Sequence, residues 1–246
     1  MKASSRTADH HSAVLKYKDG RNHVVETPWR DADLSAVAKG KPWRRFPWYL
    51  GQRNYSGVYW SATERTLVGY ESRLELAHLI LADFDACVKS IASQPFHLIF
   101  RSRGKKVHRT PDYLLLLESG PRVLEVKPAD RLLNEEVKQL LELTRAVVES
   151  AGCAYEIAVE PDELFFANVR FLAGYRRDWL FEADLLDEIH CAAAKKACSS
   201  LADIVAEVGR PKHSVLPGIF HLMWQHRLVV DLNEVLSTAS KVQVLP

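Results

Sequence analysis

Residues 110–128 read TPDYLLLLESGPRVLEVKP, and this stretch decides the fold. Its apolar run at 113–117 is typical of a buried central strand. The Ser-Gly-Pro run at 119–121 favours a turn, after which 122–127 returns as a second strand. The sequence therefore predicts a β-hairpin with one strand in the middle of a sheet.

Charged side chains stand at the open end of this hairpin. Pairing of position 112 with position 127 places Asp112 and Glu125 on one face of the sheet, whereas a one-residue slip would separate them. Carboxylates held on rigid strands suit a hard cation such as Mg²⁺. In the alternative interpretation Asp112 is a turn residue, and Glu125 and Lys127 form an exposed face. The apolar strand between them favours the metal site, because charges on a buried sheet need partners.

A helix is predicted to follow Ser72, because Glu75 lies three residues later, which is the spacing of a capping box. The helix has its apolar face at 76–84. Glu75 has two interpretations that are not exclusive. It serves as the capping carboxylate, or the helix packs on the sheet and aims Glu75 at the hairpin as a third metal ligand.

The remaining pattern predicts an α/β fold, a mixed β-sheet flanked by helices. Residues 1–27 are interpreted as a loose N-terminal segment with a short strand at 23–25. Further strands are expected at 57–70, 88–91, 96–100 and 155–159, and further helices at 132–150 and 162–175.

A second domain is expected after 177, so the predicted division is 1–27, 28–177 and 178–246. Helices at 181–197, 200–208 and 215–226, followed by a strand at 228–232, form a winged-helix pattern. Arg210, Lys212 and His213 in the turn between helices would suit DNA. The following helix is too apolar to read a groove, which favours a protein-interaction domain.

Composition sets limits on partners and compartment. The 246 residues are 47% hydrophobic and carry a net charge of only +2, so a nucleic-acid partner requires local basic patches. No apolar run reaches the ~20 residues of a membrane span, and the N-terminus lacks a secretion signal. We therefore expect a cytoplasmic protein with no membrane partner. The four cysteines form no C-x-x-C pair, which argues against structural zinc.

A basic segment leads into the hairpin. Its cations either contact phosphates along a duplex or belong to an ordinary solvated turn. The candidate DNA-binding residues are Arg101, Arg103, Lys105, Lys106 and Arg109, accompanied by His108. Arg44, Arg45 and Arg53, which lie among aromatic residues, are weaker candidates for a DNA groove.

Four segments, 72–77, 94–96, 110–113 and 125–128, together resemble the TnsA endonuclease of Tn7-type transposons, a member of the restriction-endonuclease-like PD-(D/E)XK superfamily. The resemblance covers residues 40–175, and the C-terminal region is similar in architecture to the family's winged-helix domain. It implies that Glu75, Asp112 and Glu125 are metal ligands and that Lys127 is the catalytic lysine. The Tn7 protein carries Gln at the position of Glu125, so Glu here argues against an inactivated copy.

The implied activity is Mg²⁺-dependent hydrolysis of phosphodiester bonds at the 5′ ends of a transposon, with Mn²⁺ as a substitute metal. The ion would bind Asp112, Glu125 and the Val126 carbonyl, with Glu75 completing the shell. The implied partners are double-stranded DNA at the transposon ends, a TnsB-like DDE transposase and a TnsC-like AAA+ ATPase. Two alternatives remain: a stand-alone nuclease of restriction, repair or phage, and a non-catalytic DNA-binding scaffold.

Overall fold

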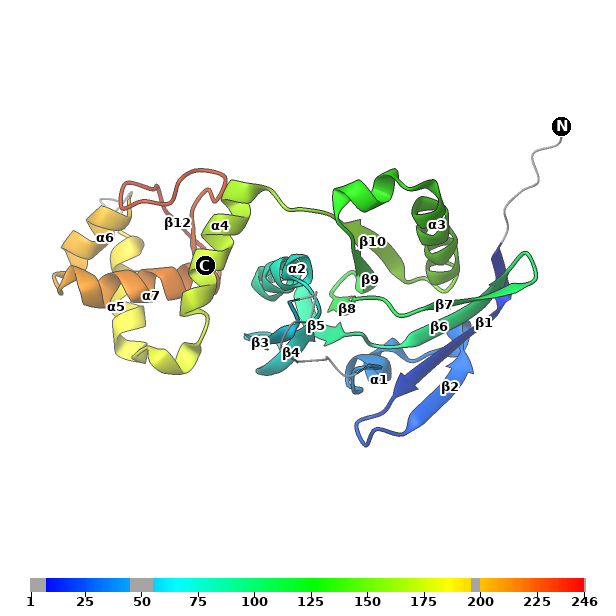
Figure 1. The fold of residues 1–246 in the computed structure, drawn as a ribbon. Coiled ribbons are helices and arrows are strands. Elements are labelled where there is room, and N and C mark those ends of the chain that lie inside the picture. The colour runs from blue at the N-terminus through cyan, green and yellow to red at the C-terminus, as the bar shows by residue number, and fades with distance from the viewer. Residues whose placement is uncertain (1–7, 45–54, 196–199, 246) are drawn as a thin grey trace. The chain divides into compact units, whose positions relative to one another are not determined.

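The computed structural model describes residues 8–44, 55–195 and 200–245 (Figure 1). The fold is mixed α/β, with several antiparallel strand pairs and helices in both halves of the chain. It divides into two compact units. The first holds the chain up to Ala82 together with Cys87–Glu160, and the second holds Asp83–Ala86 together with Pro161–Pro246.

The predicted hairpin lies in the middle of a four-stranded mixed sheet. Its strands are β8 (Tyr113–Leu117) and β9 (Gly120–Val126), and the sheet order is β10-β9-β8-β5. Strand β5 (Val88–Ser93) is antiparallel to β8, whereas β10 (Ala154–Ala158) is parallel to β9. Helix α3 (Glu135–Glu149) forms the crossover between the two parallel strands, as parallel pairing requires.

The register of the hairpin differs from the predicted one by two residues. Tyr113 pairs with Leu124, so the same register places position 112 opposite 125 instead of 127. A shift of two residues keeps every side chain on its face, and Asp112 and Glu125 still share one side. The predicted turn at 119–121 was wrong: residues 118–119 form the turn, and Gly120, at φ +119°, already begins β9.

A second antiparallel sheet has the order β2-β1-β6-β7. It corrects two predictions. The segment 1–27 is not loose where it is described, because residues 8–18 form a strand with Ala13 and Leu15 buried. The basic turn at 101–106 is a β-hairpin that bends at residues 103–104. The strands are β1 (Ala8–Lys18), β2 (Val24–Pro28), β6 (His97–Ser102) and β7 (Lys105–Arg109).

The first unit has one main core, formed by both sheets together with α3. Trp29 and Phe96 pack with their ring centroids 5.4 Å apart, and each fully buried side chain of this kind contributes roughly 1.5–3 kcal/mol. Leu98, Leu114 and Val147 are also buried there. The remaining elements are α1 (Leu34–Ala38), the hairpin β3 (Gly57–Ser61) and β4 (Thr66–Tyr70), and α2 (Arg73–Phe84).

Apart from Asp83–Ala86, the second unit begins at Pro161, ahead of the expected boundary at 178, because α4 (Glu163–Leu172) packs against α7 (Lys212–Trp224). Gly209, at φ +68°, ends α6, because glycine tolerates this left-handed conformation. The other elements are α5 (Ala183–Ala193), α6 (Leu201–Val208) and the antiparallel strands β11 (Leu228–Val229) and β12 (Gln243–Val244).

Across the described ranges, none of the helices combines the length with the apolar character that a membrane crossing demands.

Candidate active site

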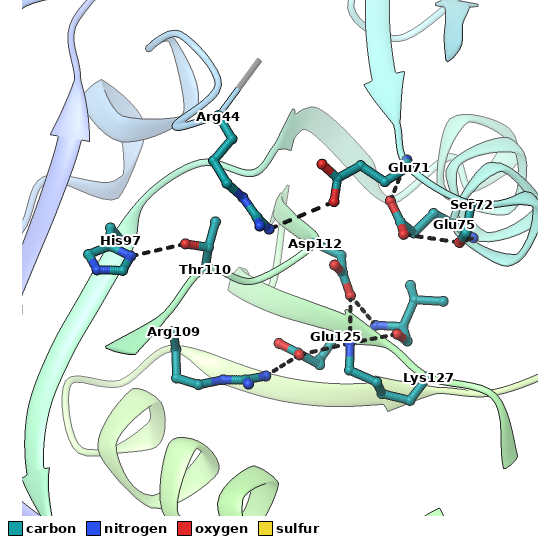
Figure 2. A network of polar contacts seen from close by, with 11 residues as sticks. Arg44, Glu71, Ser72, Glu75, His97, Arg109, Thr110, Asp112, Glu125 and Lys127 are labelled. Carbon is teal, nitrogen blue, oxygen red and sulfur yellow. Dashed lines mark hydrogen bonds and ion pairs between the residues drawn. The ribbon is translucent and has the colours of Figure 1, made fainter. Parts of the chain in front are cut away.

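Asp112 lies where the central strands end, and its backbone and side chain are both held. The backbone N–H of Gln94 donates to the Asp112 carbonyl at 2.8 Å, which extends the pairing of β5 with β8. The Val126 N–H donates to the Asp112 Oδ2 at 2.7 Å. The carboxylate is therefore fixed against the end of β9 (Figure 2).

The Lys127 ammonium group lies among three oxygen atoms at this point. Its Nζ is 3.3 Å from the Asp112 Oδ2, 3.0 Å from a Glu125 carboxylate oxygen and 2.8 Å from the Val126 carbonyl oxygen. The Lys127 backbone N–H donates to the Ala158 carbonyl at 2.9 Å, which continues the pairing of β9 with β10. A positive charge thus contacts the three oxygen atoms that the sequence predicts as metal ligands.

Glu125 is the most deeply buried acid of the site, with a side chain that is 2% exposed. Its Oε1 accepts from the Arg109 guanidinium as well as from Lys127. Its Oε2 is buried and has no hydrogen-bond partner among the described residues. Burial of a carboxylate is costly unless cations compensate it, and Arg109 and Lys127 supply that compensation.

Burial and the charges of neighbouring groups change the protonation of the cluster. Burial, together with the Glu125 charge, raises the pKa of Asp112 to about 6, against the opposite effects of Lys127 and the Val126 N–H. Burial lowers the pKa of Lys127, but the Glu125 and Asp112 charges outweigh it and the net shift is upward. The ammonium form of Lys127 is therefore stabilised, and the raised pKa of Asp112 reflects its burial and its repulsion by Glu125.

Glu75 lies near this cluster, but its carboxylate caps the N-terminus of its own helix, α2. Its carboxylate accepts from the Glu71 N–H at 2.7 Å and from the Ser72 hydroxyl at 3.0 Å, while the Glu75 N–H donates to the Ser72 Oγ at 3.1 Å. Glu75 therefore serves as the capping-box carboxylate of α2. Burial and the Asp112 charge raise the pKa of Glu75 to about 7, so the two carboxylates interact.

The structure thus brings four of the five predicted catalytic and metal-binding residues into contact and leaves the fifth beside them. Asp112, Glu125, Val126 and Lys127 form one contact network, and Glu75 lies beside it. In the part of the chain that is described, no three His, Cys, Asp or Glu side chains group closely enough to hold a metal by themselves. A metal at this point would depend on two carboxylates and the Val126 carbonyl.

The donor set nevertheless fits a hard divalent cation. Carboxylate and carbonyl oxygens are the ligands that Mg²⁺ and Mn²⁺ prefer. The buried Glu125 Oε2, which lacks a partner among the described atoms, supplies a further acceptor. The residues that would hold the ion are Asp112, Glu125 and Val126.

The basic candidates divide into two groups. Arg101, Arg103, Lys105 and Lys106 are exposed around the turn between β6 and β7. Arg109, in contrast, has a side chain that is only 17% exposed and contacts Glu125. The sequence analysis missed this pairing, because the partner of Arg109 depends on how the second sheet packs beside the first.

The weaker basic candidates are engaged or lie outside the described ranges. The Arg44 guanidinium is 3.7 Å from the Glu71 carboxylate. Arg210 pairs with Glu188 at 2.5 Å on the second unit. Arg45 and Arg53 lie outside the described residues.

Neither a protein-family model nor a curated protein matches the chain. The chemistry of the site itself is the basis for a functional conclusion.

Proposed function

We propose that this chain is a metal-dependent DNA endonuclease, the nuclease subunit of a Tn7-like transposase that hydrolyses phosphodiester bonds at the 5′ ends of the transposon. One observation carries the proposal. The Lys127 ammonium contacts oxygen atoms of Asp112, Glu125 and Val126 at the end of a rigid central hairpin. These are the groups and the arrangement that metal-assisted phosphodiester cleavage needs.

The roles of the residues follow from their contacts. A bound Mg²⁺ would lower the pKa of a water molecule and neutralise charge on the phosphoryl group. Asp112, fixed by the Val126 N–H, and Glu125, fixed by Arg109, are pre-positioned acceptors for the ion. Lys127 stays charged and stands beside them, where it can orient the water or stabilise developing negative charge.

The architecture supports the same proposal. A hairpin next to a parallel strand reached through α3, with a helix carrying Glu75 nearby, is what a restriction-endonuclease-like core would provide. We propose that the part of the second unit after residue 177, with α5, α6, α7 and a short antiparallel strand pair, is a winged-helix-like domain. Its partner would be a TnsC-like AAA+ ATPase, while a TnsB-like DDE transposase completes the 3′ reactions. These partners rest on the resemblance in sequence.

A non-catalytic DNA-binding scaffold is the second candidate, and one observation favours it. Glu125 is already neutralised by Arg109 and Lys127, and Glu75 by its helix cap. A protein that needs no metal could keep such a self-sufficient ion-pair network for stability. The two candidates differ in whether a divalent cation displaces the ammonium from these oxygens.

A plasmid-nicking assay in Mg²⁺ or Mn²⁺ tests the proposal. We expect metal-dependent nicking by the full chain in the presence of a candidate DDE transposase, and loss of nicking in Asp112→Ala and Lys127→Ala. Glu156→Gln removes an exposed acid from the adjacent strand β10 and serves as the control that keeps activity. Nicking that persists in Asp112→Ala contradicts the proposal. Nicking without any transposase favours the stand-alone nuclease.

A further inference from the structure

One face of the second sheet is packed and the other faces solvent. On β1 and β6, Leu15, Leu98 and Phe100 are buried in the core. Because side chains alternate across a strand, the residues between them point away from that core. These intervening side chains include Ile99, which is only partly buried, and Arg101, which is exposed.

The registers identify which residues share this solvent-facing side. Lys16 pairs with His97 across β1 and β6, and Arg101 pairs with Lys106 across β6 and β7. Contacts confirm the assignment, because the His97 ring nitrogens lie 3.0 Å from the Thr110 hydroxyl and 3.0 Å from His108. We call this surface the outer basic face, and its cationic and titratable members are Lys16, Lys18, His97, Arg101, Lys106 and His108.

The outer basic face carries more basic than acidic residues. Arg101 and Lys106 lie directly opposite each other, an arrangement that destabilises an isolated sheet. Two acidic residues share this face by register: Glu26 pairs with Lys16 at 2.6 Å, and Asp9 of β1 lies opposite Arg101. Lys16, Lys18, Arg101 and Lys106 outnumber these two acids, and a surface with such an excess of positive charge is suited to a polyanion.

The basic candidates of the β6–β7 hairpin separate by face. Lys106 is on the outer basic face, whereas its neighbour Lys105 pairs with Ser102 and points to the opposite side. Ser102 and Arg103 line a cavity of about 430 Å³ together with Glu136 and other residues of α3, on the core side of the sheet. The pair Arg101 and Lys106 therefore lies on the outer basic face, whereas Arg103 and Lys105 lie on the opposite side.

The outer basic face leads to the candidate active site. Thr110 follows β7 directly, contacts His97, and lies two residues before Asp112 (Figure 2). From Lys106 to Asp112 the chain spans at most about 20 Å, since an extended chain rises ~3.3 Å per residue. This upper limit corresponds to about six base pairs at the ~3.4 Å spacing of phosphates along one strand of a duplex.

The aromatic residue of this face indicates which kind of nucleic acid fits. The Trp43 ring is stacked on His97 at 5.4 Å, with planes 6° apart, and Lys18 lies over its ring at 5.8 Å. A ring engaged in this way is not offered to bases, whereas single-strand binding relies on free aromatic platforms. Among the residues that the structure describes, this face therefore offers cations and an engaged Trp43 ring, which favours the phosphate backbone of a duplex.

We propose that the outer basic face binds the phosphate backbone of double-stranded DNA and directs the duplex to Asp112. The identity of the polyanion rests on the proposed nuclease function. The division between the two faces of the hairpin, in contrast, comes from the strand registers alone.

Duplex binding in EDTA tests the proposal separately from cleavage. Fluorescence anisotropy of a labelled 20-base-pair duplex is measured with the full chain and with two charge-matched variants. The first variant, Arg101→Gln/Lys106→Gln, changes the outer basic face. The second, Arg103→Gln/Lys105→Gln, removes the same charge from the same hairpin on the other side.

We expect the outer-face variant to bind about 25-fold more weakly near 0.15 M salt, since each phosphate contact is worth about fivefold there. The slope of log K against log salt should fall by about two. The Arg103/Lys105 variant should change affinity by less than about threefold. A single-stranded oligonucleotide and polyglutamate should bind more weakly than the duplex.

Several results would overturn the inference: equal losses in both variants, no loss in the outer-face variant, no duplex binding by the parent chain, or preference for single strands or polyglutamate. Because EDTA removes the metal and prevents cleavage, duplex binding can be measured even if the chain is not a nuclease. Loss of nicking without loss of binding, or the reverse, separates the two proposals. Circular dichroism of both variants verifies that they fold.

Discussion

Lys127 is the residue on which the candidate site depends. Two buried or half-buried carboxylates, Asp112 and Glu125, would repel each other without it, and its ammonium group is within 3.3 Å of both. Arg109 compensates Glu125 from the other side. The network is therefore stable as an ion-pair cluster and also has the oxygen atoms that a divalent cation would take.

Replacement of Lys127 by alanine separates the role of its ammonium group in cleavage from metal binding by the carboxylates. We expect Lys127→Ala to lose about 10²–10³-fold in nicking rate, as loss of a charged stabilising group typically does. Binding of Mn²⁺ should remain, because Asp112, Glu125 and the Val126 carbonyl are unchanged and the ammonium group no longer competes for their oxygen atoms. Nicking kinetics and calorimetry measure the two effects, and unchanged nicking would exclude a catalytic role for Lys127.

Glu75 combines a helix cap with a position beside Asp112, and the substitution Glu75→Gln tests the consequence. The pKa of Glu75 is raised from 4.5 to about 7, so the folded state binds more protons between these pH values and stability falls as pH rises through this window. Glu75→Gln cannot ionise. In urea unfolding in EDTA, it should therefore be as stable as the parent at pH 8 or up to about 2 kcal/mol more stable.

Ser72→Ala is the matched control for Glu75. It removes the hydroxyl that pairs with the Glu75 carboxylate and N–H, at a cost of about 0.5–2 kcal/mol, but keeps the carboxylate. We expect this variant to nick DNA, whereas Glu75→Gln should not if Glu75 joins the metal shell. Equal nicking by both variants would restrict Glu75 to the helix cap.

The sequence allowed prediction of the site residues that lie on one hairpin. Asp112, Glu125 and Lys127 are close along the chain, and the face that they share survives a two-residue shift in register. Arg109 was predicted as a DNA contact, because nothing local shows that its partner is Glu125. The role of Glu75 was left open, because a capping box and a metal ligand use the same residue type.

At the scale of elements, the turn between β8 and β9 fixes the register that holds the site. Gly120 has φ +119° and open space where a Cβ would lie, so alanine there meets backbone strain but no clash. We expect Gly120→Ala to lower the free energy of unfolding by about 1–3 kcal/mol. Gly20→Ala, also in open space but without a positive φ, should stay within about 0.5 kcal/mol. Similar losses in both variants would contradict this role of Gly120.

Strand β8 was predictable because four consecutive leucines follow Tyr113, whereas β1 and β7 were not. In β1 the apolar positions Ala13, Leu15 and Tyr17 alternate over only a few residues, and the stabilising partner is the distant strand β6. In β7 the sequence Lys-Lys-Val-His-Arg suggests a solvated turn, since the strand is charged on its exposed side. Both segments become strands because they pair with β6, which is not apparent from their local sequence.

At the scale of the whole molecule, the second unit contains a buried histidine that makes its stability depend on pH. The His221 Nδ1 donates to the Tyr175 carbonyl at 2.7 Å, and its ring stacks on Phe181 at 4.3 Å. Burial lowers the pKa of His221 below 6.5, an effect that Arg227 reinforces and Asp178 opposes.

The unfolded chain therefore binds more protons than the folded chain, and stability is lost as pH falls below about 6.5. Urea unfolding of the full chain, compared between the parent and His221→Gln, should show this loss in the slope of the free energy of unfolding against pH between pH 7 and 5. His213→Gln on the exposed side of the same helix should leave the slope unchanged. His221→Gln should reduce it, and an unreduced slope would assign the effect to other groups.

Titration of the full chain with Mn²⁺ in a calorimeter is the most direct test of the central claim, that Asp112 and Glu125 together hold a divalent cation. We expect saturable binding by the parent chain and none by Asp112→Asn or Glu125→Gln, while Glu156→Gln binds like the parent. Mn²⁺ binding that is absent from the parent chain, or undiminished in both site variants, would contradict it.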